Sequence, residues 1–185
     1  MELQPAILLY VPRSIMEQTL DELLTSESFE FIASLSIKKS IIFEHQAHCS
    51  GELLSSFAKK GFDIQFQSDL TTETSLLTII ETTFYEGSNS VLVMDGTMSQ
   101  LAKSDIEQAL VKLHHFDVVI GPTKEQKCYL VGMKKVIPSL SKCLSRDITY
   151  TLNETLGELK QAGKRFYLLP EKSVHIPEDK LLALP

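Results

Sequence analysis

Short apolar runs alternate along the chain with longer segments of helical periodicity, and this alternation constrains the fold more than any other feature. The run Ala6–Val11 is almost continuously apolar, as expected for a strand covered on both faces. Strands that alternate with helices of this kind indicate right-handed crossovers and a mainly parallel sheet. The runs predict seven strands, at 6–11, 40–44, 63–67, 90–94, 117–121, 128–133 and 165–169.

The segments between these runs carry apolar stripes at helical spacing. In Ser50–Lys60 the stripe includes Leu53 and Phe57, and Gly61 is placed to end the helix. Ser104 followed by Glu107 predicts a capping box at the start of another helix. The remaining helices are predicted at 72–86 and 151–162, with a further helix over 14–35 that is broken near 26–28.

One connection is too short for a helical crossover. Only the six residues Pro122–Lys127 join the fifth and sixth runs, so these two strands are predicted to be antiparallel. The prediction is therefore a three-layer α/β/α, Rossmann-like fold with a mixed, mainly parallel sheet. Neither a repeat nor a linker divides the chain, so residues 1–185 are predicted to form a single domain.

Composition excludes some partners. With 18 basic and 24 acidic residues the net charge is −6, which gives no electrostatic footprint for nucleic acid or an anionic membrane.

The three cysteines are odd in number and widely spaced, which predicts reduced thiols in a cytoplasmic protein. The first apolar run is too short for a membrane span or a secretion signal.

Asp95 is the most suggestive single residue. Ligands in open α/β sheets bind outside the carboxyl ends of the strands, and Asp95 follows the fourth apolar run directly. A carboxylate followed by Gly96 suits a divalent cation that bridges a diphosphate. The alternative is a turn aspartate bonded to its own backbone.

Other motifs carry less chemistry. His45, His48 and Cys49 lack a second ligand pair at a recognisable distance, so a polar loop explains them better than zinc does. The chain contains no G-x-G-x-x-G or G-x-x-x-x-G-K-[ST] loop, so a dinucleotide or P-loop site is not supported.

The order of segments from about residue 88 to 180 resembles a bacterial family of glycosyltransferase-like proteins, often described as transferases associated with radical-SAM or selenium gene clusters. The resemblance implies the GT-A fold of nucleotide-diphospho-sugar transferases, which cofactor guanylyltransferases share. The segments that carry it are Ser90–Met94, Leu101–Leu110, Asp117–Pro122, Tyr129–Met133, Leu152–Leu156, Phe166–Pro170 and Ile176–Asp179.

The resemblance also implies a nucleotide or nucleotide sugar at the ends of the first strands, and a metal held by an aspartate after the fourth. The family pattern there is G-S-D-x-P-x-L. In the alignment this chain has Thr97 where the family has its aspartate, and the nearest acid is Asp95, two residues earlier. In the family pattern D-V-D-T-P-E-D the second acid aligns with His175. The candidates are Asp95 and His175 for Mn²⁺ or Mg²⁺, Glu125 and His175 for catalysis, and Pro12, Arg13, Asp95 and Thr97 for the nucleotide.

Site positions depart from the family pattern while scaffold positions match it. The family pattern D-G-G-Y-Y-L-I-G falls on 125–132, so Gln126 and Lys127 replace two glycines. Threonine removes a hard anionic ligand at 97, and histidine at 175 is softer than a carboxylate.

The favoured hypothesis is therefore a GT-A-like protein with a degenerate metal site and weak or no transferase activity. Such a protein would bind a nucleotide or another small anion weakly, or act through a partner surface, with Mn²⁺ or Mg²⁺ as its cofactor or with none. One alternative is an active, metal-dependent glycosyltransferase in which Asp95 holds the metal. Another is a nucleotidyltransferase of the cofactor guanylyltransferase type, although the glycine- and lysine-rich loop of those enzymes is missing after Val11.

Overall fold

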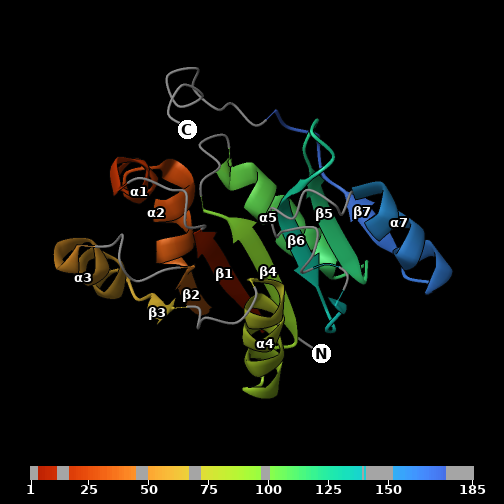
Figure 1. Ribbon diagram of the computed structural model, residues 1–185, viewed down its shortest axis with the longest axis horizontal. Helices are drawn as coiled ribbons and strands as arrows, with labels where there is room; N and C mark the ends of the chain where they lie inside the picture. Colours follow the sequence, from red (N-terminus) through yellow and green to blue (C-terminus); the bar gives the residue numbers. More distant parts are fainter. Residues whose placement is uncertain are drawn as a thin grey trace.

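The computed structural model forms one seven-stranded sheet flanked by helices (Figure 1). It describes residues 4–11, 17–44, 50–66, 72–96, 101–138, 140 and 152–173. The strand order is β3-β2-β1-β4-β6-β5-β7. The strands are β1 (Pro5–Val11), β2 (Lys38–Phe43), β3 (Asp63–Phe66), β4 (Ser90–Asp95), β5 (Val118–Pro122), β6 (Cys128–Met133) and β7 (Phe166–Leu168).

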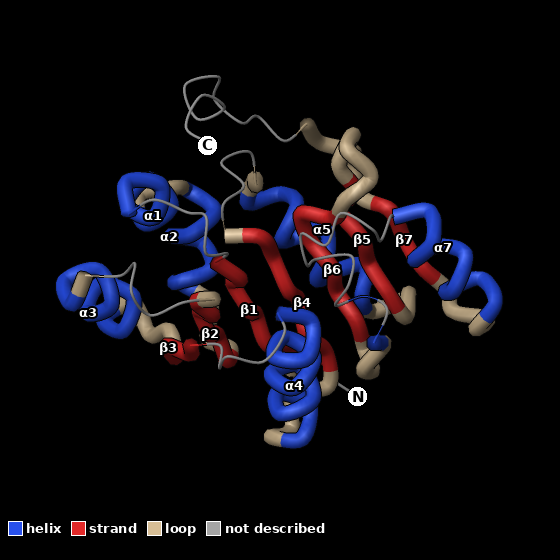
Figure 2. The backbone as a smooth tube through the Cα atoms, viewed as in Figure 1, coloured by secondary structure: helices blue, strands red, loops and turns tan. Residues whose placement is uncertain are grey.

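Helices cover both faces of the sheet, and each face has its own apolar cluster. The cluster around Leu9, Phe57 and Ile106 packs α1, α2, α3 and α5 on one face. The cluster around Leu8, Ile80 and Leu159 packs α4 and α7 on the other, where α4 lies in front of the sheet in Figure 2. The helices are α1 (Glu17–Leu24), α2 (Glu27–Ser34), α3 (Gly51–Lys59), α4 (Thr72–Tyr85), α5 (Lys103–Leu113) and α7 (Leu152–Gln161).

The strand directions confirm the predicted mixed sheet. β1 pairs in parallel with β2 and β4, β2 with β3, and β5 with β7. β6 is antiparallel to both of its neighbours, β4 and β5. The short connection after β5 is therefore a hairpin turn, because no crossover helix is needed to reach an antiparallel neighbour.

The carboxyl ends of the parallel strands meet at one edge, which is uppermost in Figure 1. The chain order reverses between β1 and β4, because β2 and β3 lie on one side of β1 while β6, β5 and β7 lie beyond β4. In open α/β sheets a ligand crevice forms at such a reversal. The fold thus directs attention to the ends of β1 and β4.

Two details differ from the sequence predictions. The start of α5 is not a Ser104–Glu107 capping box, because the N-cap is Ala102 and its backbone N–H donates to the Asp105 carboxylate at 2.8 Å. Cys128 is disulfide-bonded, so the prediction of three reduced thiols is wrong. Cys128 is the only cysteine among the described residues, so its partner lies outside them.

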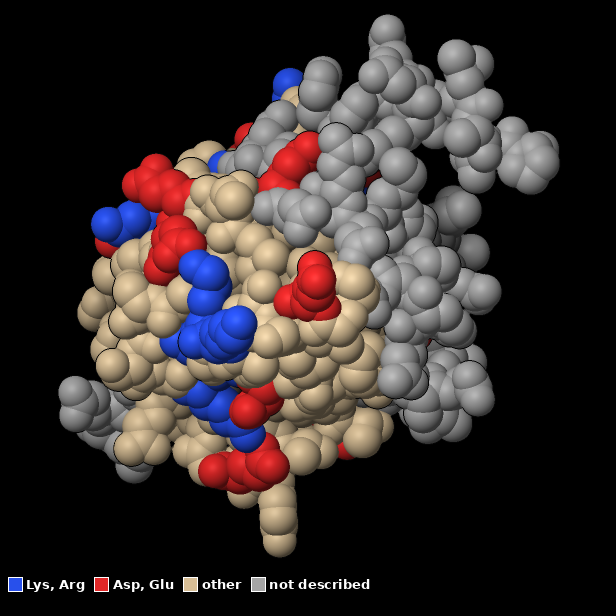
Figure 3. All heavy atoms as spheres, turned by 90° about the vertical axis from the view of Figure 1, so that its left-hand side faces the viewer, with Lys and Arg blue, Asp and Glu red and all other residues tan. Residues whose placement is uncertain are grey.

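The charged surface is mixed where it can be seen. On the face shown in Figure 3, basic side chains lie beside acidic ones. Exposed ion pairs join Lys38 to Glu86 and Lys60 to Glu30. Among the described helices, none combines the length and apolar character needed to cross a membrane.

Candidate functional site

Asp95 ends β4 at the point where the chain order reverses. It pairs with Tyr10 of β1, and its side chain is partly buried. The next residue, Gly96, donates its backbone N–H to the carbonyl oxygen of Tyr10 at 2.8 Å. A Cβ at Gly96 would lie 3.1 Å from that oxygen and 3.2 Å from Val11 Cγ2, so glycine lets the chain continue close to β1. The carboxylate is thereby held beside the carboxyl end of β1.

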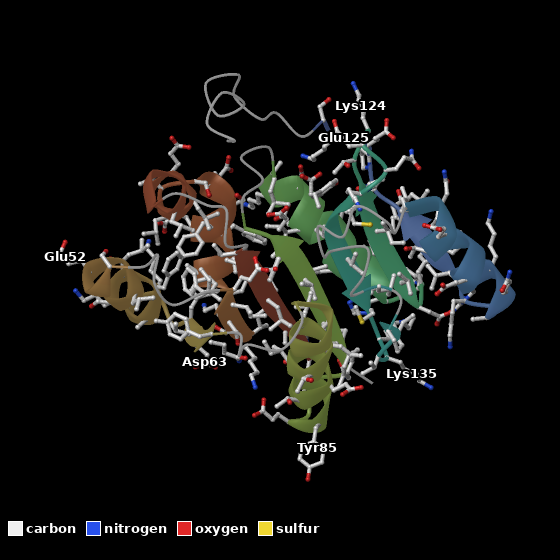
Figure 4. All side chains as sticks on the ribbon, viewed as in Figure 1. Glu52, Asp63, Tyr85, Lys124, Glu125 and Lys135 are labelled. Carbon is white, nitrogen blue, oxygen red and sulfur yellow. The ribbon has the colours of Figure 1, made fainter. Side chains whose placement is uncertain are left out.

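The β5–β6 hairpin forms a second part of this edge. Thr123 N–H donates to the Lys127 carbonyl at 2.8 Å, and Gln126 N–H donates to the Thr123 carbonyl at 3.1 Å. Gln126 has φ = 59°, the left-handed conformation that follows a type I turn in three-residue hairpins. The side chains of Lys124 and Glu125 are exposed at the tip, as Figure 4 shows.

Gln126 retains a conformation that glycine adopts without strain. The family pattern has glycines at 126 and 127, but the turn keeps its left-handed residue without glycine. Its carbonyl also accepts a hydrogen bond from Leu152 N–H at 2.8 Å, which ties the turn to α7. Its Oε1 atom is buried and has no hydrogen-bond partner in the described part of the chain.

Sequence reasoning missed a connected polar set at the same edge. Lys172, which follows β7, forms a 2.6 Å ion pair with Asp105 in the first turn of α5. Tyr129 of β6 donates its hydroxyl to the Pro170 carbonyl at 3.2 Å, and the Lys172 ammonium lies 5.5 Å from the Tyr129 ring centroid. Asp105 stands three residues after the N-cap, a usable sequence signal, whereas nothing marks Lys172.

Burial changes the acidity of Tyr129. Loss of solvent raises the pKa of its phenol well above the ordinary value, and the negative charge of Asp105 raises the pKa further. Tyr129 is therefore a neutral hydrogen-bond donor across the physiological range.

The described residues include only some of the predicted site. Asp95 and Glu125 both lie at the carboxyl edge of the sheet, on β4 and in the β5–β6 hairpin. Outside the described residues lie Pro12, Arg13, Thr97, His175 and the loop cluster His45, His48 and Cys49.

The donor set for a metal is sparse. Within the described ranges no three His, Cys, Asp or Glu side chains form a group that could hold an ion. Asp95 alone supplies one carboxylate, whereas Mg²⁺ prefers octahedral oxygen ligands and often takes one or two carboxylates together with substrate phosphates.

Comparison with known proteins identifies the fold. The sequence profile of a family described as "Uncharacterized protein conserved in bacteria (DUF2064)" matches residues 36–147, more than half of the chain. No curated protein sequence matches this chain. The profile match begins earlier than the resemblance noted from residue 88 and also covers β2 and β3.

Solved structures share the fold at low sequence identity. A protein from Desulfovibrio desulfuricans G20 assigned as a nucleotide-diphospho-sugar transferase has a TM-score of 0.71 and 16% identity, over 93% of this chain and 82% of that one. The 4-diphosphocytidyl-2C-methyl-D-erythritol synthase of Anaerococcus prevotii DSM 20548 has a TM-score of 0.66 and 13% identity, over 98% and 94%.

A third structure was solved with its ligands. The mannosyltransferase of Pyrobaculum calidifontis, in complex with GDP-Man and Mn²⁺, has a TM-score of 0.65 and 10% identity, over 96% of this chain and 58% of that one. These similarities confirm the predicted nucleotide-diphospho-sugar transferase fold.

Proposed function

This chain belongs to the bacterial family described as "Uncharacterized protein conserved in bacteria (DUF2064)", and we propose that it binds a nucleotide or nucleotide sugar with weak or no transferase activity. The ligand would occupy the crevice outside the carboxyl ends of β1 and β4. Similar folds that bind such ligands support this proposal. A CMP:2-keto-3-deoxy-manno-octonic acid synthetase with a TM-score of 0.51 and 7% identity was solved with CTP, and the mannosyltransferase of Pyrobaculum calidifontis was solved with GDP-Man.

One observation carries the proposal. Asp95 lies at the chain-order reversal, where ligands of open α/β sheets bind, and Gly96 holds the following backbone against Tyr10. At this point a carboxylate lies next to a stretch of backbone that has no side chain at Gly96. This arrangement suits a diphosphate that is bridged by a cation.

The donor set favours a weak metal site. An ion held by Asp95 would need further oxygens, and the diphosphate of the nucleotide can supply them. Such an ion, when bound, would neutralise diphosphate charge and stabilise a departing nucleoside diphosphate. We therefore expect Mn²⁺ or Mg²⁺ and nucleotide to bind together, each weakly alone. Manganese is the better probe, because His175 is a softer ligand than the carboxylate it replaces.

The remaining roles follow from the family resemblance. Pro12, Arg13 and Thr97 are proposed to contact the nucleotide, and His175 to add a metal ligand. In an active enzyme Glu125 and His175 would be the catalytic pair. Glu125 is exposed at a hairpin tip, so it meets solvent rather than an enclosed cavity in this conformation. This exposure favours weak or absent transfer over efficient catalysis.

The test is a thermal-shift panel of UDP, GDP, CDP, CTP, UDP-glucose and GDP-mannose, each with and without Mn²⁺. A ligand at a hundred times its dissociation constant stabilises the folded state by about 2.7 kcal/mol, which is visible as a melting shift. We expect a shift that requires both nucleotide and Mn²⁺ and is lost in Asp95→Asn.

The matched control is Asp63→Asn, which removes an exposed carboxylate from the start of β3, at the opposite edge of the sheet (Figure 4). This variant should shift as the wild type does. Absence of any shift, or an undiminished shift in Asp95→Asn, would overturn the proposal. Turnover of UDP-glucose or GDP-mannose that depends on Asp95 would establish the active glycosyltransferase instead, and nucleotidyl transfer from CTP would establish the nucleotidyltransferase.

The compartment is a separate proposal. We propose a cytoplasmic location, and the disulfide at Cys128 removes one of the arguments that led to it. Disulfides are rare in cytosolic proteins because thiol systems keep them reduced. Alkylation of free thiols in freshly lysed cells, followed by mass spectrometry, would test the compartment: a labelled Cys128 agrees with the cytoplasm and a protected one does not.

A further inference from the structure

Basic side chains gather at the amino edge of the sheet, opposite the proposed nucleotide site. Three segments meet there: the end of α5 with the residues after it (112–117), the residues directly after β6 (134–135), and the end of α7 with its turn into β7 (160–165). Six lysines and arginines and one aspartate give these segments a charge of +5, whereas the whole chain carries −6. We call this surface the basic edge. Its basic residues are Lys112, Lys134, Lys135, Lys160, Lys164 and Arg165.

Hydrogen bonds hold the three segments side by side. Asp117 N–H donates to the Arg165 carbonyl at 2.8 Å, and Lys134 N–H donates to the Asp117 carbonyl at 3.1 Å. The Lys134 ammonium donates to the His114 carbonyl at 3.0 Å, which joins the end of β6 to the end of α5. The three segments therefore form one continuous surface.

The basic edge is remote from the carboxyl edge of the sheet. Val118, the first residue of β5, pairs with the last residue of β6 and the first residue of β7, so the three strands reach this side together. Figure 4 shows Lys135 at the opposite end of the sheet from Lys124 and Glu125, which lie at the tip of the β5–β6 hairpin. Strands of this length span about 17–20 Å. A small ligand at one edge therefore does not touch the other.

Local structure accounts for only part of this charge. A helix favours cations at its carboxyl end, where Lys160 stands in α7, and Arg165 Nε lies 3.9 Å from the Asp117 carboxylate. Lys135 and Lys160 are both exposed, and within the described ranges neither has a carboxylate partner. Glu158, the acid nearest to Lys160 in the sequence, forms no ion pair with it there. Like charges left close together repel one another, and an acidic ligand would relieve that repulsion.

The chemistry of the basic edge favours an acidic protein segment over a nucleic acid. Arginine is the preferred residue for phosphate recognition, but the one arginine of this surface, Arg165, is engaged with Asp117. Single strands stack on free aromatic faces, whereas the Tyr167 ring carries the Lys112 ammonium 4.6 Å from its centroid and lies 5.4 Å from the Phe116 ring. The overall charge of −6 also repels a long polyanion. A short acidic segment needs only the local positive charge.

We propose that the basic edge is a docking surface for an acidic segment of a partner protein. Complementary charge speeds the encounter and selects the partner, and Lys135 and Lys160 supply the charge that no carboxylate in the described part of the chain neutralises. The surface does not overlap the crevice at β1 and β4, so partner and nucleotide can be held together. The proposal does not depend on nucleotide binding.

The test uses a fluorescein-labelled peptide of ten glutamates and the full chain, followed by fluorescence anisotropy in about 50 mM salt. Exposed ion pairs are individually weak, so we expect a Kd of about 100 µM. Salt raised to about 300 mM should weaken binding about tenfold, because it screens exposed charges. The variant Lys135→Gln/Lys160→Gln should bind about tenfold more weakly than the wild type, because two unpaired cations are gone.

The matched control is Lys59→Gln/Lys124→Gln, which removes two equally exposed charges from α3 and from the β5–β6 hairpin. It should change the affinity by less than about twofold, because those charges are too far away to act through salt. Both double variants should keep the wild-type melting temperature, since surface substitutions change stability little. Equal losses of affinity in the two variants, or no loss in either, would overturn the proposal. So would a wild type that does not bind the peptide.

Amide chemical shifts locate the bound peptide. The largest changes should fall in 134–135 and 160–165, and changes concentrated at the carboxyl edge would contradict the proposal. A labelled oligothymidine of ten nucleotides represents the competing class of partner. It should bind about tenfold more weakly than the peptide, because the surface offers neither a free arginine nor a free aromatic face. Oligothymidine binding as tight as that of the peptide would make this a nucleic-acid site and the inference wrong.

Discussion

The ring of Tyr129 occupies the space that a side chain at Gly121 would need. A Cβ atom at Gly121 would lie 2.5 Å from Cζ and 2.6 Å from Cε2 of Tyr129. The ring has little freedom to move, since its hydroxyl is bonded to Pro170 and Lys172 lies over its face. The two residues belong to adjacent antiparallel strands, β5 and β6. The ring fits because position 121 has no side chain, and position 121 must be glycine because the ring fills that space.

Gly121→Ala should destabilise the protein by about 3 kcal/mol, because overpacking a filled core displaces the ring or the strand. Urea denaturation measures the change. The control is Gly157→Ala in the middle of α7, where nothing lies within 4 Å of the new Cβ. That change should stabilise by about 0.5–1 kcal/mol through helix propensity. Equal stabilities of the two variants would contradict the packing described.

Gln126 offers a test of backbone strain. Gln126→Gly should be more stable than Gln126→Ala by about 1 kcal/mol, since both remove the buried Oε1 but only glycine relieves the left-handed φ. Both variants lack the side-chain amide, so the difference between their free energies of unfolding in urea reports only the cost of the left-handed backbone conformation. An alanine variant as stable as the glycine variant would show that the turn relaxes to another conformation.

Gln126 also shows where sequence reasoning reached its limit. The alternation of apolar runs and helical stripes predicted the seven strands, the helices on both faces and the antiparallel strand, because periodicity reports directly which residues are buried. The conformation of one turn residue is not encoded by its type alone. A lost glycine can therefore leave the left-handed turn in place, as it does at Gln126.

The Asp105–Lys172 pair was unpredictable for another reason. Its partners are remote in the sequence. The position of Asp105 near the start of α5 is a sequence signal for a helix cap, but no motif marks Lys172, so only the folded sheet brings the two together. Asp95 could be predicted because ligands bind at the carboxyl ends of strands, and the end of a strand can be located from a short stretch of sequence. Cys128 was misjudged because cysteine spacing cannot reveal which sulfur atoms meet.

Tyr129 should make stability depend on pH above the ordinary phenol pKa of 10.0. Its pKa is raised in the folded state by burial and by Asp105, so the unfolded chain loses the phenol proton first. The stabilisation is complete below pH 10 and is lost as pH rises beyond it, by up to about 1.4 kcal/mol per pH unit. Urea titrations from pH 8 to 11 should show this added loss in the wild type and not in Tyr129→Phe.

Tyr129→Phe should also cost about 1 kcal/mol at pH 8, because it removes the hydrogen bond to Pro170. The difference between the two proteins should therefore shrink as pH rises. A constant difference from pH 8 to 11 would mean that Tyr129 titrates alike in the folded and unfolded states.

Two adjacent lysines on β2 should respond differently to the same substitution. The buried Lys39 ammonium donates to the carbonyls of Ala33 at 2.5 Å and Leu35 at 2.9 Å, at the end of α2. Burial lowers the pKa of Lys39, yet its removal would leave those carbonyls without their donor. Lys39→Met should cost about 1–3 kcal/mol.

The neighbour Lys38 is the control for this experiment. It forms a surface pair with Glu86, and exposed pairs contribute at most about 1 kcal/mol. Lys38→Met should therefore change the urea midpoint little. Similar losses in both variants would indicate that the chain-wide charge, and not the carbonyl contacts, determines the effect.

The antiparallel direction of β6 has an electrostatic consequence for any bound anion. A parallel strand followed by a crossover helix presents that helix's N-terminus, and so a partial positive charge, at the carboxyl edge. After β5 the chain makes a tight turn instead, with an exposed glutamate at its tip. The nearest helix N-terminus at this turn belongs to α7, whose first residue, Leu152, donates its N–H to the Gln126 carbonyl at 2.8 Å. That carbonyl already takes up one N–H of the helix start, and the glutamate at the tip opposes the helix dipole. Because the glutamate and the neighbouring Lys124 are exposed, salt should screen their effect on a bound anion.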